Sequence, residues 1–280
     1  MANYKDIHGI NIETVTSNPD NPANGQVWYN STDQKLRANA QTTAGAWSTG
    51  GSVNAARQLP FGAGSQTAGL MAGGNPGSTA SNELYNGTSW TEVANLNTGR
   101  HAGAASGITN TAVLAFGGYS TAYVSIAEEW NGSSWTEVGD LNLARWEVYG
   151  QGSSNTAALC TGGQSPGGTY ANNENWNGSS WTEVADVNTA KTKGAAAGQS
   201  NTSVLVFGGN PSPSQSAKTE EWNGTGWTEI ADLSTGRREL GGAGIVTAAL
   251  AFSGEAPPNT TATEEFAGAG ANDTKEFDLS

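Results

Sequence analysis

The chain has 280 residues, of which 13% are charged, with 39 glycines, 10 tryptophans and a formal net charge of −13. This acidic balance argues against nucleic acid or an anionic membrane as a partner, because phosphate binding needs clustered Lys and Arg. No apolar run approaches the roughly 18 residues of a membrane-spanning helix, and Met1–Ile10 does not resemble a secretory signal. We therefore expect no nucleic-acid binding and no membrane insertion.

Residues 1–44 lie outside the repeats that follow and are predicted to form an N-terminal arm. Val27–Asn30 and Lys35–Ala38 flank a polar turn at Ser31–Gln34, a pattern typical of a short β-hairpin. The phrase GQVWYNSTDQKLR resembles segments of tail-fibre and other virion proteins of bacteriophages, especially marine ones. The resemblance implies a virion location, reached from the host cytoplasm by lysis, and attachment of the arm to other virion proteins.

Residues 45–280 contain five copies of one pattern: an apolar run ending in a glycine doublet, an acidic–aromatic–Asn-Gly element, and a tryptophan. Successive tryptophans are 45, 46 and 46 residues apart in the clearest copies, which contain Trp90, Trp135, Trp181 and Trp227. Such a regular period indicates one supersecondary unit repeated, and a unit of this size cannot bury its apolar face alone.

Each copy is predicted to form four strands, and the second copy shows why. Arg100–Ile108 is small and apolar, and Ala112–Phe116 is a continuous apolar run that ends in a glycine doublet, as in a strand buried on both faces. Glu128–Trp130 and Trp135–Val138 flank an Asn-Gly turn, which tolerates the positive φ angles of a tight hairpin. Four antiparallel strands repeated around an axis predict an all-β fold, a β-propeller.

The order of a cation, an apolar run with Gly-Gly, an acidic–aromatic pair and a tryptophan resembles the kelch repeat, from about Trp47 to the end of the chain. The cations are Arg57, Arg100, Arg145, Lys191 and Arg237. The resemblance implies a kelch-like propeller and says almost nothing about function, which must be argued from a site.

The two ends of the repeat region depart from the pattern. The fifth copy has Ser253–Gly254 in place of the doublet and lacks the Asn-Gly turn and the tryptophan, whereas Trp47 stands alone ahead of the first copy. A Trp47 strand that completes the last blade gives five four-stranded blades and removes an open sheet edge. Six blades remain an alternative, with a hybrid blade of Val27–Asn30, Trp47 and Lys275–Leu279.

No catalytic, metal or cofactor motif stands out, so we expect a protein that is not an enzyme and needs no cofactor. Galactose oxidase, which some kelch-type propellers resemble, needs a copper site that two histidines and the lone Cys160 cannot reproduce. Cys160 lies in an apolar run and is predicted to be a small buried side chain. Calcium binding by the recurring Asp140–Asn142 segments between blades is a weaker reading than turn formation.

The charged residues that recur in each copy can be structural or can bind a ligand. The opening cations either bond carbonyls or a carboxylate of the neighbouring blade, or form a cationic ring that captures an anion. The paired carboxylates, such as Glu128–Glu129, point to opposite faces of a strand and are read as structural or solubilising.

The repeat varies most in the loops between the second and third strands, which lie on the same face as the connections between blades. These loops span residues 75–82, 119–127, 164–173, 210–219 and 255–263. Variable loops on a rigid scaffold are where binding function usually lies. The candidate ligand-binding residues are aromatic: Tyr119, Tyr123, Trp146, Tyr149 and Tyr170.

Two functions follow from these patterns. In the first, the protein is a non-enzymatic phage adhesin, such as a tail fibre, whose loop face binds a host-surface glycan or protein. In the second, it is an assembly or decoration protein of the virion without a receptor role. A homo-oligomer is compatible with both.

Overall fold

A computed structural model describes residues 12–17, 27–32, 35–38, 50–211, 214–256 and 259–268. The chain divides into two compact units, one formed by residues 1–49 and 272–280 and the other by Gly50–Ala271. In the first unit, β2 (Val27–Asn30) pairs antiparallel with β3 (Lys35–Ala38), so the predicted hairpin is confirmed. The strand β1 (Glu13–Val15) adds to β2 in parallel.

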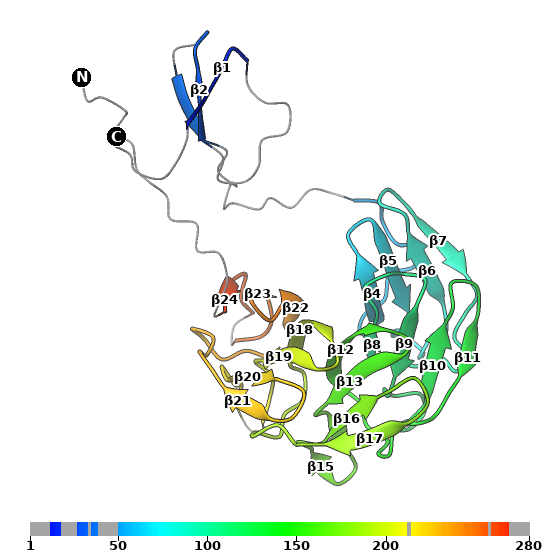
Figure 1. Ribbon diagram of the computed structural model, residues 1–280. Coiled ribbons are helices and arrows are strands. Elements are labelled where there is room, and N and C mark those ends of the chain that lie inside the picture. The colour runs from blue at the N-terminus through cyan, green and yellow to red at the C-terminus, as the bar shows by residue number, and fades with distance from the viewer. Residues whose placement is uncertain are drawn as a thin grey trace. The chain divides into compact units, whose positions relative to one another are not determined.

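The second unit is a five-bladed β-propeller, and its described residues contain no helix (Figure 1). Each blade is an antiparallel sheet whose strands follow one another in sequence from the innermost outward. The first four blades have four strands each: β4 (Phe61–Ser65), β5 (Ala68–Ala72), β6 (Asn82–Tyr85) and β7 (Trp90–Val93); β8 (Ala104–Ser106), β9 (Val113–Phe116), β10 (Ala127–Trp130) and β11 (Trp135–Glu137); β12 (Tyr149–Ser154), β13 (Ala157–Thr161), β16 (Asn173–Trp176) and β17 (Trp181–Val184); β18 (Ala195–Ser200), β19 (Ser203–Phe207), β20 (Thr219–Trp222) and β21 (Trp227–Glu229). The strands predicted for the second copy are confirmed.

The fifth blade has three strands among the described residues: β22 (Gly241–Ile245), β23 (Ala248–Phe252) and β24 (Thr263–Ala267). Val27–Asn30 belongs to the separate β1–β3 sheet, so the six-blade alternative with this segment in a hybrid blade is wrong. Trp47 and Lys275–Leu279 lie outside the described residues.

The innermost strands are rich in small residues, which lets five of them surround a narrow central channel. Ala63, Ala105 and Ala243 line it together with the amides of Gln151 and Gln199. A short hairpin of β14 (Gln164–Ser165) and β15 (Gly168–Thr169) projects from the loop between β13 and β16.

The outer hairpins have the predicted Asn-Gly turns. In blade 2, Gly132 has a φ of +94°, and the Asn131 side-chain oxygen accepts hydrogen bonds from the backbone N–H groups of Ser133 and Ser134, both at 3.0 Å. The turn is closed within a few residues, and its sequence hardly varies from blade to blade.

The core lies between blades, since each blade is too thin to bury its own side chains. Trp130, Phe116 and Leu114 are fully buried, and the Trp130 indole N–H donates to the Asn110 carbonyl at 2.9 Å. Among the tryptophans that define the period, Trp135 and Trp181 are buried, and Trp90 and Trp227 are half-buried.

A buried ion pair recurs in every blade and corrects one reading of the repeating cations. Each cation precedes the first strand of its blade and pairs with the glutamate of the third strand of the same blade, not of a neighbour: Arg57 with Glu83, Arg100 with Glu128, Arg145 with Glu174, Lys191 with Glu220, and Arg237 with Glu264. The cation side chains are at most 2% exposed, so they form no open ring for an anion.

The same cations also connect neighbouring blades through their backbone. The second glycine of each doublet donates its N–H to the carbonyl of the next blade's cation, as Gly74 does to Arg100 and Gly118 does to Arg145, both at 2.9 Å. The first glycine has a φ near +64°, and a Cβ at Gly73 would lie 2.4 Å from the Arg100 carbonyl oxygen. The doublets are therefore required for close contact between blades.

Candidate functional site

The loop face, which carries the second-to-third-strand loops and the connections between blades, has one variable pair of residues per blade. Each pair joins the residue after the buried cation to the residue after the glycine doublet by an isolated antiparallel bridge. We call these the rim pairs: Gln58/Asn75, His101/Tyr119, Trp146/Gln164, Thr192/Asn210 and Arg238/Glu255. The buried ion pairs and the doublets hold these positions rigidly, while their chemistry differs from blade to blade.

The rim pairs of blades 2 and 3 bring aromatic side chains together. His101, Tyr119, Tyr123 and Trp146 form one cluster, which we call the aromatic cluster. The Tyr119 ring lies 5.6 Å from the His101 ring, 5.7 Å from the Tyr123 ring and 5.4 Å from the Trp146 ring, measured between centroids. All four side chains are half-buried, so they pack on one another and still present surface to solvent.

Backbone and side-chain hydrogen bonds hold the aromatic cluster in place. His101 and Tyr119 exchange backbone hydrogen bonds of 3.0 and 2.8 Å. Ser78, from the loop of blade 1, places its hydroxyl 3.1 Å from the Nδ1 atom of His101 and 3.0 Å from the Ser120 carbonyl. Three loop segments from two blades therefore fix the imidazole and the Tyr119 ring.

The polar atoms of the cluster define what it offers a ligand. Burial lowers the pKa of His101 below its usual value, which keeps the imidazole neutral at neutral pH. The Tyr119 hydroxyl donates to the Thr121 carbonyl at 3.2 Å. The Nε1 atom of Trp146 is covered and has no hydrogen-bond partner within the described part of the chain. The cluster thus combines apolar ring faces with uncharged polar groups.

Tyr149 does not belong to the loop face, which corrects its placement among the candidates. It is the first residue of β12, is 4% exposed and packs with Leu159 and Val206 in the core between blades 3 and 4. Burial raises the pKa of its hydroxyl well above the usual value. The sequence alone suggested a loop position for Tyr149. In the structure β12 begins at this residue, and its side chain points into the core.

Tyr170 lies on the loop face but outside the ring contacts of the aromatic cluster. It is half-buried, follows β15 and donates its backbone N–H to the Gly163 carbonyl at 2.9 Å. His101 was absent from the sequence-based candidates. The signal that points to it is its position directly after the cation, the same position as Trp146.

A second polar feature surrounds the channel on this face. The residue two places after each cation has a left-handed backbone: Leu59, Ala102, Glu147, Lys193 and Glu239 have φ between +51° and +57°. Four backbone hydrogen bonds link these residues from blade to blade, such as Glu239 N–H to the Lys193 carbonyl at 2.9 Å. Lys193 Nζ lies 2.5 Å from Glu239 Oε1 and 3.5 Å from Glu147 Oε1. This network is satisfied internally and joins blades 3, 4 and 5.

The remaining candidate residues, Cys160 and the Asp140–Asn142 segment, have structural roles. Cys160 is fully buried, and burial raises its pKa to about 12. The Asn142 backbone N–H and side-chain amide both donate to Glu174, at 2.7 and 2.8 Å, so this connection serves the blade's ion pair. In the described ranges, no three His, Cys, Asp or Glu side chains gather as a metal site would require, and no helix has the length and apolar character to span a membrane.

Comparisons with known proteins support the fold and give no information on function. No family model matches the chain, and no curated protein matches it. Among 232 matching chains of solved structures, one titled "Structure of YjhT" has a TM-score of 0.61 and 12% identity, and the match covers 72% of this chain and 73% of that chain. At this identity the likeness supports the propeller architecture.

Proposed function

We propose that this protein is a binding module without catalytic activity, and that its aromatic cluster is the ligand site. Within this proposal the chain is a kelch-like propeller of a bacteriophage particle, acting as a tail-fibre or surface adhesin. The single observation that carries the binding role is the convergence of His101, Tyr119, Tyr123 and Trp146 at one place on the loop face. Clustered aromatic side chains with polar tips dominate many binding surfaces.

A host-surface glycan is the ligand that best fits this chemistry. Sugar rings have apolar C–H faces that stack on aromatic rings and hydroxyl groups that bond uncharged polar atoms. The neutral imidazole of His101 and the exposed hydroxyl of Tyr119 are such groups. A protein ligand with an exposed aromatic or aliphatic side chain would use the same ring faces, and the binding assay below separates the two.

The non-enzymatic part of the proposal is supported by the way the carboxylates are used. Glu128 and Glu174 lie in the blades that carry the cluster, and each is bonded to a buried arginine and to an asparagine. A general acid or base must be free to bond the substrate. We assign these carboxylates to the scaffold.

The N-terminal sheet of β1, β2 and β3 supports a division of labour within the proposal. It belongs to a different compact unit from the propeller and pairs with none of the propeller's described strands. We propose that this arm attaches to other virion proteins while the propeller binds the host. In the alternative proposal, a decoration protein of the virion, the arm still attaches to other virion proteins but the propeller binds no host receptor.

The test uses two double variants of the full-length protein. Tyr119→Ala with Trp146→Ala removes the centre of the aromatic cluster, and Thr192→Ala with Asn210→Ala alters a rim pair without aromatic rings. Binding to host cells and to a glycan array should be lost in the first variant and kept in the second, with both folded by circular dichroism. Retained cell binding by the cluster variant would refute the adhesin role. Binding to cells but to no glycan would identify a protein ligand.

A further inference from the structure

The Ser78 hydroxyl decides which ring nitrogen of His101 carries the proton. Its Oγ atom lies 3.0 Å from the Ser120 carbonyl oxygen and 3.1 Å from Nδ1 of His101. The Tyr119 carbonyl oxygen is a second acceptor, at 3.5 Å. A carbonyl oxygen can only accept, so the single hydroxyl proton of Ser78 is used on these carbonyls. The contact with His101 then requires a proton on Nδ1, and the hydrogen-bond network assigns the neutral imidazole as the Nδ1–H tautomer.

The surrounding backbone holds Ser78 in this position. Ser78 has a left-handed backbone with a φ of +50°, and the N–H of Thr79 donates to the Gly74 carbonyl at 2.9 Å. Gly99, in the connection to blade 2, packs so closely that a Cβ on it would lie 2.1 Å from the Ser78 carbonyl oxygen. Both blades therefore fix the hydroxyl, and with it the tautomer of His101.

The other ring nitrogen of His101 is left for a ligand. Nε2 has no hydrogen-bond partner within the described part of the chain, and it is not among the covered polar atoms there, in contrast to Nε1 of Trp146. Without a proton, Nε2 is an acceptor. The Tyr119 hydroxyl likewise uses its proton on the Thr121 carbonyl, which leaves its oxygen free to accept. Both groups present acceptors, so a ligand must supply the donors.

The described part of the propeller has no unpaired cation for an anionic ligand. Every Lys and Arg side chain in it forms an ion pair with a glutamate. Besides the five buried pairs, the ion pairs are Lys193 with Glu239, Lys218 with Glu229, and Arg238 with Glu255. Carboxylate, sulfate and phosphate groups are recognised mainly by free Arg and Lys side chains. With a net charge of −13, this protein is poorly suited to bind them.

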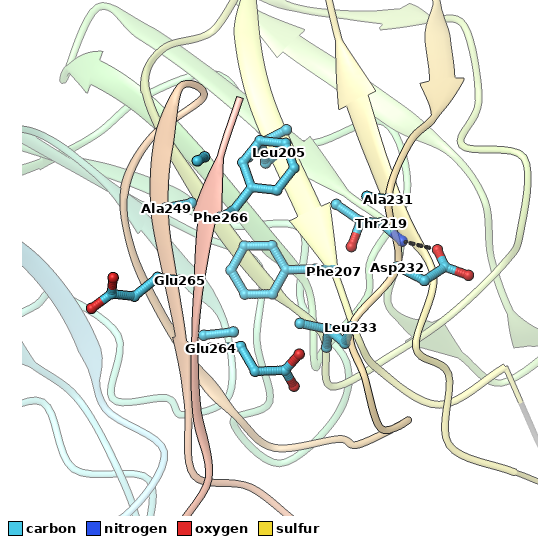
Figure 2. A pocket seen from close by; sticks show the side chains of 12 residues that line it. Leu205, Phe207, Thr219, Ala231, Asp232, Leu233, Ala249, Glu264, Glu265 and Phe266 are labelled. Carbon is cyan, nitrogen blue, oxygen red and sulfur yellow. Dashed lines mark hydrogen bonds between the residues drawn. The ribbon is translucent and has the colours of Figure 1, made fainter. Parts of the chain in front are cut away.

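A groove between blades 4 and 5 is no better suited to an anion. It has a volume of about 280 Å³. Figure 2 shows Phe207 and Phe266 in this groove, with the carboxylates of Asp232, Glu264 and Glu265 at its sides. The negative potential of these carboxylates opposes the approach of an anionic group. An anionic ligand is therefore disfavoured here as well as at the aromatic cluster.

We propose that the ligand of the aromatic cluster is a neutral glycan rich in hydroxyl groups, and that one of these hydroxyl groups donates to Nε2 of His101. The apolar face of the sugar contacts the rings of Tyr119 and Trp146, whose centroids lie 5.6 and 6.2 Å from that of His101. Ser78 is a positioning residue, because it sets the tautomer. This inference rests on the proposed binding role of the cluster and adds the charge of the ligand and the direction of one hydrogen bond.

The tautomer can be measured by NMR of the full-length protein with isotope-labelled histidine. The chain has two histidines, His8 and His101, so the signals lost in His101→Phe are those of His101. Above neutral pH we expect a proton on Nδ1 and none on Nε2. Ser78→Ala should remove this preference. The matched control is Ser81→Ala, a serine of the same loop whose hydroxyl contacts Thr79 at 3.0 Å, and it should keep the preference. A proton on Nε2 in the wild type would overturn the proposal, whatever the protein binds.

The ligand class is tested on a glycan array that carries each neutral glycan in three forms: unmodified, extended by a neutral hexose, and extended at the same position by sialic acid. The wild type should bind neutral forms and reject the sialylated ones. His101→Phe keeps a ring and removes the acceptor, so it should weaken binding to the best neutral glycan about tenfold, the effect of one lost hydrogen bond. His101→Gln, whose amide oxygen accepts, should restore part of this loss. Ser78→Ala should weaken binding by a smaller factor, because the acceptor tautomer is still partly populated.

Fluorinated sugars identify the hydroxyl group that donates. Fluorine cannot donate a hydrogen bond, so replacing the donor hydroxyl should weaken binding to the wild type about tenfold and have no further effect on His101→Phe. Preference for sialylated glycans, or unchanged glycan binding by His101→Phe, would overturn the proposal and leave the adhesin role intact. Binding to host cells without binding to any glycan would also overturn it. A wild type that binds neither cells nor glycans would instead refute the proposed function itself.

Discussion

The guanidinium of Arg145 and the carboxylate of Glu174 meet inside blade 3, with Nη2 2.8 Å from Oε1 and side chains 0% and 3% exposed. Arg145 also donates to the carbonyls of Gly162 and Asn172, at 2.8 and 2.6 Å. Glu174 accepts two hydrogen bonds from Asn142. One ion pair thus joins the connection between blades, the glycine doublet and the third strand. Because Trp146 directly follows Arg145, the same ion pair also fixes the position of Trp146 on the loop face.

Removing one partner of this pair should be costly. Arg145→Met leaves the Glu174 carboxylate buried without its cation, and we expect a loss of about 3–5 kcal/mol in the free energy of unfolding, measured by urea denaturation. Replacing both, with Arg145→Met and Glu174→Leu, should cost less than Arg145→Met alone, because no buried charge is left over. A double variant as unstable as the sum of the singles would mean that the two residues act independently.

Blade 4 has the weakest version of the pair. Lys191 Nζ lies 3.8 Å from Glu220 Oε1, and that oxygen is buried without a hydrogen-bond partner in the described part of the chain. Burial lowers the pKa of Lys191. Lys191→Arg supplies the forked donor that the other blades use, so it should stabilise the protein by about 1 kcal/mol, the value of one added hydrogen bond. Lys191→Met is the control and should destabilise.

Ser253 takes the place of the first glycine of the doublet in blade 5 and has a φ of +60°. A residue with a Cβ is disfavoured in this left-handed conformation by about 1–2 kcal/mol. Ser253→Gly should therefore raise the melting temperature. The greater conformational entropy of glycine in the unfolded chain offsets part of this gain. Ser253→Ala keeps the strain and should show no gain. Gly117→Ala, at the same position in blade 2, should lower stability, because its Cβ would lie 2.9 Å from the Arg145 carbonyl oxygen.

His101 should make stability depend on pH below neutrality. Burial lowers its pKa in the folded protein below the unfolded value of about 6.5. The unfolded chain therefore takes up this proton first as the pH falls, so stability is complete above pH 6.5 and declines as the pH drops through the folded pKa. The difference in unfolding free energy between the wild type and His101→Asn should shrink over this window. A difference that is constant from pH 7 to pH 5 would contradict the shifted pKa.

Cys160 should be unreactive in the native protein. It is fully buried, and its pKa of about 12 leaves almost no thiolate at neutral pH. A thiol reagent such as DTNB should label it only after unfolding in denaturant. Rapid labelling of the native protein at pH 8 would show that the core between blades 2 and 3 opens readily.

Much of the propeller follows from the sequence by local rules. The spacing of Trp90, Trp135, Trp181 and Trp227 determines the size of the blade, the Asn-Gly pairs determine the outer hairpins, and the apolar runs before each doublet determine the buried second strands. These features depend on neighbours within a few residues, so a period in the sequence is enough to read them.

The site depended on contacts that no local pattern contains. His101, Tyr119 and Trp146 come from two blades and meet only because both rim pairs are held at the same level of the ring. The sequence alone identified Tyr119, Tyr123 and Trp146 as aromatic exceptions in variable positions, and it established the repeat that carries them. The tertiary structure decided that His101 joins them and that Tyr149 faces the core, because the direction of a side chain is determined by where its strand begins and by the blade packed against it.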